Sequence, residues 1–163
     1  MGAATRYLCR GRLEGGERIF LWETNDRDRV VVDEAGDVVS FATEAEALEA
    51  RATSAGISSE PSAFYDFDAI QAWCHSRNQA VDCPAVLNIW NLLNDVPGVQ
   101  ELFSAAESRA AEIYGKLFHG CNLPAMGASP CEYVPEWTSA EILDLKRLIL
   151  LGLNDFRMRC KSW

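Results

Sequence analysis

Only one local group in this sequence has residue types and a spacing that suggest a chemical site. His119 and Cys121 lie two residues apart, and Cys131 follows in the same loop-like segment. Imidazole and thiolate groups are common zinc ligands, and a thiolate beside an imidazole can act as a nucleophile. Strong zinc signatures carry paired C-x-x-C spacings, which this sequence lacks. A small thiol- or zinc-dependent enzyme therefore stays an alternative, while we predict neither a bound metal nor another cofactor.

Other catalytic signatures are missing from the sequence. Cys74 and His75 are adjacent on a predicted helix, where successive side chains point about 100° apart, so they do not form a local nucleophile–base pair. The sequence contains no Walker loop, no G-x-G-x-x-G, no G-x-S-x-G and no H-E-x-x-H. We therefore predict that the protein is not an enzyme and assign no catalytic residue.

The charge balance instead favours a protein partner. The chain holds 24 acidic residues against 15 lysines and arginines, a net charge of −9, and the excess is spread over both halves. Such a surface repels a phosphate backbone, which disfavours direct nucleic-acid binding, and it attracts a basic protein. Acidity also keeps many proteins in solution without any partner. An acidic structural adaptor is therefore a second alternative.

Two acidic clusters are compact enough to act as contact surfaces. The first is a predicted hairpin turn with Asp33, Glu34 and Asp37, and the second is a predicted helix start with Asp66 and Asp68. Turns and helix starts are usually exposed, so their carboxylates can meet the arginines and lysines of a partner without disturbing the core. We predict these five residues as partner-binding residues, although helix capping alone also explains Asp66 and Asp68.

The first forty residues read as β-structure. Short segments rich in β-branched and aromatic residues are separated by turn residues, and they cover 5–12, 16–23, 29–33 and 37–41. Links this short join antiparallel neighbours. We predict an antiparallel β-meander of about four strands.

Helical patterns follow this meander. Helix starts are predicted from capping residues at Thr43, Asp66, Asp82 and Thr138, and a further helix from apolar spacing over 103–117. Residues 56–64 form the only linker-like stretch, between a β-rich subregion 1–56 and a helical subregion 64–163. The fold class is therefore α+β: a single domain, 1–163, in which the meander packs against about four to five helices.

One predicted helix is apolar almost all round but carries Asn88, Asn91 and Asn94, with Asp95 after them. A helix so apolar is expected to be central, and buried amides there must be hydrogen-bonded. We favour an internal hydrogen-bond ladder, with a contact stripe and simple exposure as alternatives.

The location of the protein follows from what the chain lacks. The N-terminus has no apolar signal segment, and no apolar run approaches the ~18 residues of a membrane span. We predict a soluble cytoplasmic protein without a membrane partner, whose six cysteines are mostly buried free thiols. The sequence does not indicate an oligomeric state.

Several short motifs together resemble a known group of proteins. They are VVVDEAGDVVSF at 30–41, YDFDAIQAWC at 65–74, LNIWNLLNDVP at 87–97 and VPEWTSAEILDLKRLILLGLNDF at 134–156. This combination resembles bacterial immunity proteins of polymorphic toxin systems, with the contact-dependent growth inhibition type nearest, over most of residues 16–156.

The resemblance implies a protein that binds one cognate toxin domain, frequently a nuclease, and blocks it. A nuclease needs a basic cleft for its substrate, and an acidic inhibitor complements such a cleft. The family supplies no transferable catalytic residues, and its contact residues differ between members. The five acidic residues above therefore rest on physical reasoning alone.

Overall fold

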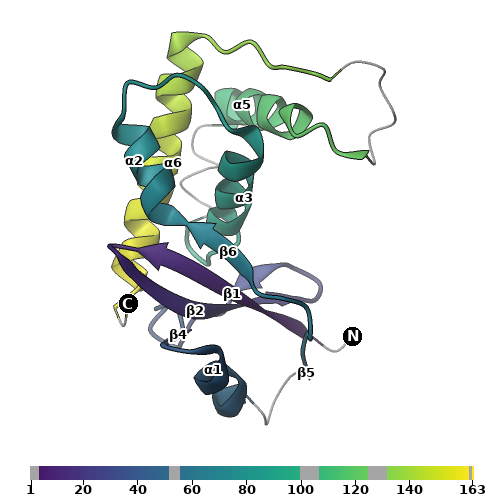
Figure 1. Ribbon diagram of the computed structural model, residues 1–163, viewed down its shortest axis with the longest axis vertical. Helices are drawn as coiled ribbons and strands as arrows, with labels where there is room; N and C mark the ends of the chain where they lie inside the picture. Colours follow the sequence, from purple (N-terminus) through teal and green to yellow (C-terminus); the bar gives the residue numbers. More distant parts are fainter. Residues whose placement is uncertain (1–3, 52–55, 100–106, 125–131, 162) are drawn as a thin grey trace.

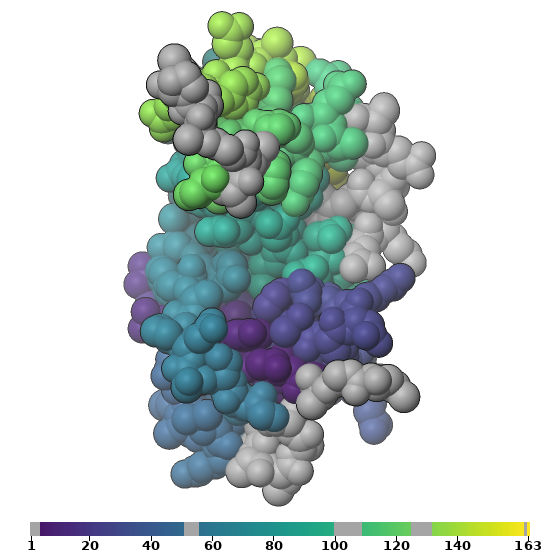
Figure 2. Space-filling view, turned by 90° about the vertical axis from the view of Figure 1, so that its right-hand side faces the viewer, coloured from purple at the N-terminus to yellow at the C-terminus, as the bar shows by residue number. Residues whose placement is uncertain are grey.

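The computed structural model describes residues 4–51, 56–99, 107–124, 132–161 and 163. Figure 1 shows one sheet with helices α2, α3, α5 and α6 gathered on one side and helix α1 on the other. Figure 2 shows the same division from the side, with the strand-rich N-terminal part in purple and blue below the helices in teal to yellow. The predicted α+β class is confirmed, with strands in the N-terminal half and helices toward the C-terminus.

The centre of the sheet is a long hairpin. Strand β1 (Thr5–Leu13) pairs antiparallel with β2 (Gly16–Thr24) over all nine residues of each. The turn between them is Glu14–Gly15, and both residues have positive φ, at 53° and 76°. Positive φ at both central residues is the type I′ geometry that matches the twist of a hairpin. Alternation along β2 sends Phe20 and Trp22 to the face of the helical layer and Leu21 to the face of α1.

The next two strands do not extend the meander outward one after the other. Strands β3 (Arg29–Val30) and β4 (Ser40–Phe41) both pair antiparallel with β2, at different heights along it. Between them the chain forms a small hairpin that is joined by a bridge of Val32 with Val38. The predicted segments 29–33 and 37–41 are thus mostly this hairpin, and only their outer ends lie in the sheet.

The segment predicted as a linker, 56–64, contributes to the sheet, which corrects the boundary between the two subregions. Strands β5 (Gly56–Ile57) and β6 (Ala63–Asp66) both pair with β1, and both run parallel to it. Helix α1 (Glu44–Arg51) carries the chain across one face, from β4 on one side of the central hairpin to β5 on the other. Parallel pairing requires a long crossover of this kind. Within the described residues the sheet is therefore mixed, with six strands, and it extends to Asp66.

The helical layer begins where the sequence predicts. Helices α2 (Phe67–His75) and α3 (Cys83–Asn94) start after Asp66 and Asp82, whose carboxylates accept hydrogen bonds from Ala69 N and Ala85 N. Helix α5 (Glu107–Gly120) matches part of the predicted helix 103–117, whose first residues lie outside the described ranges. Helix α6 (Ser139–Arg159) starts with the predicted capping box of Thr138 and Glu141. None of the helices in the described ranges is long and apolar enough to cross a membrane.

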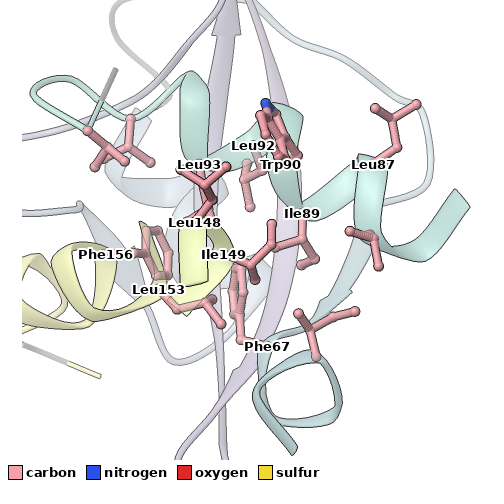
Figure 3. Close-up of a cluster of buried hydrophobic side chains, with 14 of the residues drawn as sticks. Phe67, Leu87, Ile89, Trp90, Leu92, Leu93, Leu148, Ile149, Leu153 and Phe156 are labelled. Atoms are coloured by element: carbon pink, nitrogen blue, oxygen red, sulfur yellow. The ribbon is translucent and has the colours of Figure 1, made fainter. Parts of the chain in front are cut away.

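The main core lies between the sheet and the helical layer. Phe67 at the start of α2 and Phe156 near the end of α6 are both fully buried, with ring centroids 4.8 Å apart. Figure 3 shows these rings beside Ile149 and Leu153 of α6, with Leu93 of α3 next to Leu148. Phe20 of the sheet joins the same aromatic group. One continuous cluster therefore unites strands and helices.

A second, smaller core lies under α1. It consists of Leu8, Ile19 and Leu21 from the sheet and Ala47 from the helix, which is the only residue of α1 with a buried side chain in the range 44–50. The two faces of the sheet are thus covered very unequally.

Candidate functional site

The first acidic cluster forms a tightly ordered turn at the tip of the small hairpin. One carboxylate oxygen of Asp33 accepts hydrogen bonds from the backbone N–H groups of Ala35 and Asp37, both at 2.9 Å. The Asp33 N–H donates to Asp37 O at 2.8 Å, and Gly36 N–H donates to Asp33 O at 3.0 Å. An aspartate that satisfies its own turn in this way fixes the turn conformation. Asp33 therefore has a structural role in addition to any contact role.

This turn is also attached to the end of α6. Lys161 lies 2.8 Å from a carboxylate oxygen of Asp37, and Arg159 donates through Nη1 to Gly36 O at 3.2 Å. The backbone N–H of Val38 donates to Arg159 O at 2.8 Å. Asp37 is thus half-buried and paired with Lys161, whereas the side chains of Asp33 and Glu34 remain exposed.

The second acidic cluster is engaged in holding the fold. Asp66 caps α2 and lies 3.4 Å from Nη1 of Arg12. Asp68 accepts the backbone N–H of Glu14 at 2.7 Å and of Gly15 at 2.9 Å. Glu14 and Gly15 form the β1–β2 turn, in which Glu14 has a positive φ, a conformation that is uncommon for a residue other than glycine. Asp68 therefore stabilises this turn, and both aspartates are only partly exposed.

The structure brings the two clusters to the same end of the molecule but keeps them as separate surfaces. The end of α6 and the residues just after it lie between them, because Arg157 of α6 pairs with Glu14 at 2.9 Å while Lys161, beyond the helix, pairs with Asp37. Of the five predicted contact residues, Asp33 and Glu34 are the exposed ones.

His119 and Cys121, the described residues of the thiol or zinc alternative, do not form a recognisable catalytic or metal site. His119 is exposed at the end of α5, and the thiol of Cys121 donates to Leu117 O at 3.2 Å. Burial raises the pKa of the Cys121 thiol, which disfavours a thiolate at neutral pH. Cys131 lies outside the described ranges. Within those ranges no group of three or more metal-ligating side chains is present.

The remaining thiols behave as small apolar side chains. Cys9, Cys74, Cys83 and Cys160 are free and buried, as predicted. Burial raises the pKa of Cys9 and of Cys160 to about 12 and that of Cys74 to about 11. A thiol with so high a pKa is unreactive at neutral pH.

The prediction of a buried asparagine ladder on α3 is wrong. Asn88 and Asn91 are exposed, and Asn94 is half-buried. Asn91 accepts a hydrogen bond from the Tyr114 hydroxyl of α5 at 3.1 Å, across the rim of the α3–α5 contact. The apolar residues of α3 are nevertheless buried, as expected, so the asparagines mark its outward side.

Sequence reasoning missed a charged network on the α1 side of the sheet. Glu23 is only 3% exposed, and its carboxylate lies 2.7 Å from Nε of Arg6 and 2.6 Å from Nη2 of Arg29. Burial raises the pKa of Glu23, but hydrogen bonds from Arg29 and Arg6 outweigh this effect and leave the pKa below its usual value. The available signal was that Glu23 lies in phase with the buried Ile19 and Leu21.

The network lines a pocket of about 380 Å³ beside β3. We call it the β3 pocket. Its polar side consists of Arg6, Glu23 and Arg29, its apolar wall includes valines 30–32, and Asp33 and Glu34 also line it. The hairpin turn and the charged network are therefore neighbours, and together they form the candidate site.

Neither the comparison with models of known protein families nor the comparison with curated proteins gave a match, and no solved structure matched the fold. The candidate site is therefore interpreted from its own geometry and charge.

Proposed function

We propose that this chain is an immunity-type protein of the cytoplasm that binds and neutralises a basic toxin domain of the nuclease class. The observation that carries the proposal is the ordered acidic turn, which presents the exposed carboxylates of Asp33 and Glu34 on a backbone fixed by hydrogen bonds. The net charge of −9 and the sequence resemblance support it.

Order in the turn favours binding. Association is weakened by the entropy lost when flexible loops become fixed, and a turn that is already ordered avoids most of that loss. The attachment of Gly36 and Asp37 to Arg159 and Lys161 adds a second restraint. The two exposed carboxylates are therefore held in a defined position relative to the body of the protein.

The charge of the turn suits a protein that competes with nucleic acid. A nuclease binds phosphates through arginine and lysine side chains, and carboxylates accept the same charge-assisted hydrogen bonds. Long-range attraction between an acidic inhibitor and a basic enzyme raises the association rate, and salt weakens that effect.

The partner for the test is sought next to the gene of this chain: an immediately upstream gene for a large secreted protein is expected, and the C-terminal domain of that protein is used. The variant Asp33→Asn/Glu34→Gln/Asp37→Asn removes three charges but keeps the side-chain oxygen with which position 33 holds its turn. A control, Glu112→Gln/Glu132→Gln/Glu136→Gln, removes three exposed charges from the helical half. Association and dissociation rates are measured at low and moderate salt, together with inhibition of the nuclease.

We expect the turn variant to associate at least about tenfold more slowly at low salt and to lose most of its salt dependence. The control should retain most of the rate of the unmodified protein. A domain that does not bind the unmodified chain contradicts the proposed function. If both variants weaken binding equally, the effect is a non-specific one of net charge, and the turn is excluded as the contact.

A further inference from the structure

Helix α6 exposes one narrow stripe along its length. Between residues 141 and 159 only five side chains are exposed, at successive spacings of four, four, three and four residues: Leu143, Arg147, Leu151, Asn154 and Met158. At about 100° per residue these positions fall within about 80° around the helix, and a rise of about 1.5 Å per residue spreads them over about 22 Å. We call this set the α6 stripe. The other side chains of α6 in this range are buried or half-buried.

Three members of the α6 stripe are apolar. Leu143 is 49% exposed, Leu151 50% and Met158 76%. Scattered exposed apolar side chains are common, but several on one face of one helix form a patch of the kind that marks a contact with another protein. The Arg147 side chain among them is 67% exposed, and its guanidinium lies 3.9 Å from a carboxylate oxygen of Asp144, so it is only loosely paired.

The α6 stripe matches itself when it is reversed. Leu143 and Met158 lie equally far from a midpoint just before Leu151, and so do Arg147 and Asn154. In an antiparallel pair of α6 helices, Leu143 of one copy therefore lies at the level of Met158 of the second copy. Leu151 meets its own counterpart at the two-fold axis. A two-fold interface requires a surface that is complementary to itself in this way.

The polar members of the α6 stripe fit the same arrangement. Arg147 of one copy lies at the level of Asn154 of the second copy and one residue from the level of Asp155. The amide oxygen of Asn154 and the carboxylate of Asp155, whose side chain is 30% exposed, can both accept from a guanidinium. A parallel pair would instead place Arg147 against its own counterpart, where like charges repel. The charges therefore favour the antiparallel arrangement.

We propose that this chain forms a weak homodimer through the α6 stripe, with the two helices antiparallel around Leu151. The inference does not depend on the proposed toxin partner. A contact between two single helices is smaller than a standard interface of about 800 Å² per partner. Each copy also carries a net charge of −9, which opposes association until salt screens it. We therefore expect a Kd on the order of 100 μM at moderate salt.

The test is sedimentation velocity of the full chain from about 5 to about 500 μM, on both sides of the expected Kd. Moderate salt and a reductant exclude charge repulsion and disulfides between copies as causes of the result. Leu151→Glu places two carboxylates beside each other at the two-fold axis and should weaken the dimer by about tenfold or more. Leu48→Glu on α1 is the matched control, because Leu48 is 47% exposed and the change in net charge is the same. Thermal melts confirm that both variants are folded.

A charge exchange tests the antiparallel register. Arg147→Glu should weaken the dimer by about tenfold, because the introduced carboxylate meets Asn154 and Asp155 of the second copy without a cation. Adding Asn154→Arg should restore most of the affinity, because each introduced carboxylate then faces an introduced guanidinium across the interface. An ion pair within one copy would not restore association, so the rescue reports contact between copies.

Dimerisation of the unmodified chain that Leu151→Glu weakens, Leu48→Glu leaves unchanged and the charge exchange restores supports the proposal. A chain that stays monomeric at the highest concentration overturns it and leaves the α6 stripe to a different protein. Equal losses with Leu48→Glu and Leu151→Glu also overturn it. So does a dimer that Leu151→Glu does not affect, or a loss with Arg147→Glu that Asn154→Arg does not rescue.

Discussion

The two faces of the sheet differ in how they are covered, and the neighbours Phe20 and Leu21 show the difference. Both side chains are fully buried, but Phe20 packs among aromatic rings of the helical layer, with Phe67 at 6.5 Å and Phe156 at 6.1 Å between centroids. Leu21 belongs to the small cluster under α1. The first face supplies most of the core, whereas the second leaves room for buried charge and for the β3 pocket.

Most of the apolar burial lies on the helical side of the sheet, whereas the α1 side keeps charged groups near solvent. Apolar burial on the helical side provides the larger part of the folding free energy, because it removes the most apolar surface from water. The thin cover on the other side allows the network of Arg6, Glu23 and Arg29 to remain beside solvent. Charges that stay near solvent can meet a partner without a large rearrangement.

The largest effect is expected for Phe20→Ala. Removing a fully buried ring at the centre of the aromatic cluster leaves a cavity and should lower the free energy of unfolding by ~3–5 kcal/mol. Chemical denaturation measured by tryptophan fluorescence and by circular dichroism gives this value. Phe20→Leu keeps most of the volume and should cost clearly less. A loss below about 1 kcal/mol for the alanine variant would remove the distinction between the two faces.

A smaller effect is expected for Leu21→Ala on the opposite face. The lost side chain is again fully buried, but α1 is short and Ala47 is its only buried side chain in the range 44–50, so the helix can settle into the space. The cost of a large-to-small change depends on how well the site collapses. We expect ~2–3 kcal/mol by the same denaturation measurement. A value equal to that of Phe20→Ala would show that the α1 face is packed as firmly as the other.

The charged network gives the third prediction. Glu23→Gln keeps the size of the side chain but leaves Arg6 and Arg29 without a negative partner. Removing one member of a buried ion pair is costly, and partial exposure of Arg29 reduces the cost, so we expect ~1–3 kcal/mol. The exposed Glu49→Gln on α1 is the control and should lie within about 0.5 kcal/mol of the unmodified protein. An unchanged stability for Glu23→Gln would mean that the network contributes nothing to the fold.

The smallest effect concerns the acid stability of the helical side. The hydrogen bond from Lys116, together with the backbone of Thr138, lowers the pKa of Glu141 to about 2. Because the folded pKa lies below the unfolded value of about 4.3, the stabilisation is complete above that value and is lost as the pH falls through about 2.

Glu141→Gln should therefore lower the Tm at pH 6. At pH 2–3 the difference between the Tm of the variant and that of the unmodified protein should be smaller. Glu112→Gln is the matched control, because Glu112 lies one turn before Lys116 on α5. The four-residue spacing of Glu112 and Lys116 would allow an ion pair along one face of α5, whereas the structure places Lys116 Nζ 2.6 Å from a carboxylate oxygen of Glu141. Tm curves against pH that are parallel for the unmodified protein and Glu141→Gln would contradict this assignment.

Helix starts were predictable because their signals are local. Asp66, Asp82 and Thr138 cap helices through residues three positions away, and each prediction is confirmed. The outward side of α3 was not predictable in the same way. Its pattern is apolar on most sides, and the packing of α3 against α5, α6 and α2 decides which side faces solvent.

Strand partners showed the same limit. Residues 56–57 and 63–66 have no strong β pattern, and they become strands because β1 offers them an edge. Such pairing joins residues far apart in the sequence, so composition does not reveal it. The acidic turn was located by its sequence, but its attachment to Lys161 was not.

The sequence by itself determined the α+β class, the central hairpin, the helix caps and the position of the acidic turn. Each of these depends on periodicity or on hydrogen bonds within a few residues. Only the tertiary structure decided that Asp68 serves the β1–β2 turn, that Lys116 pairs with Glu141, and that Glu23 meets two arginines. These partners come from distant parts of the chain. Which of these residues come into contact depends on which apolar faces pack together, and a local sequence pattern does not predict that packing.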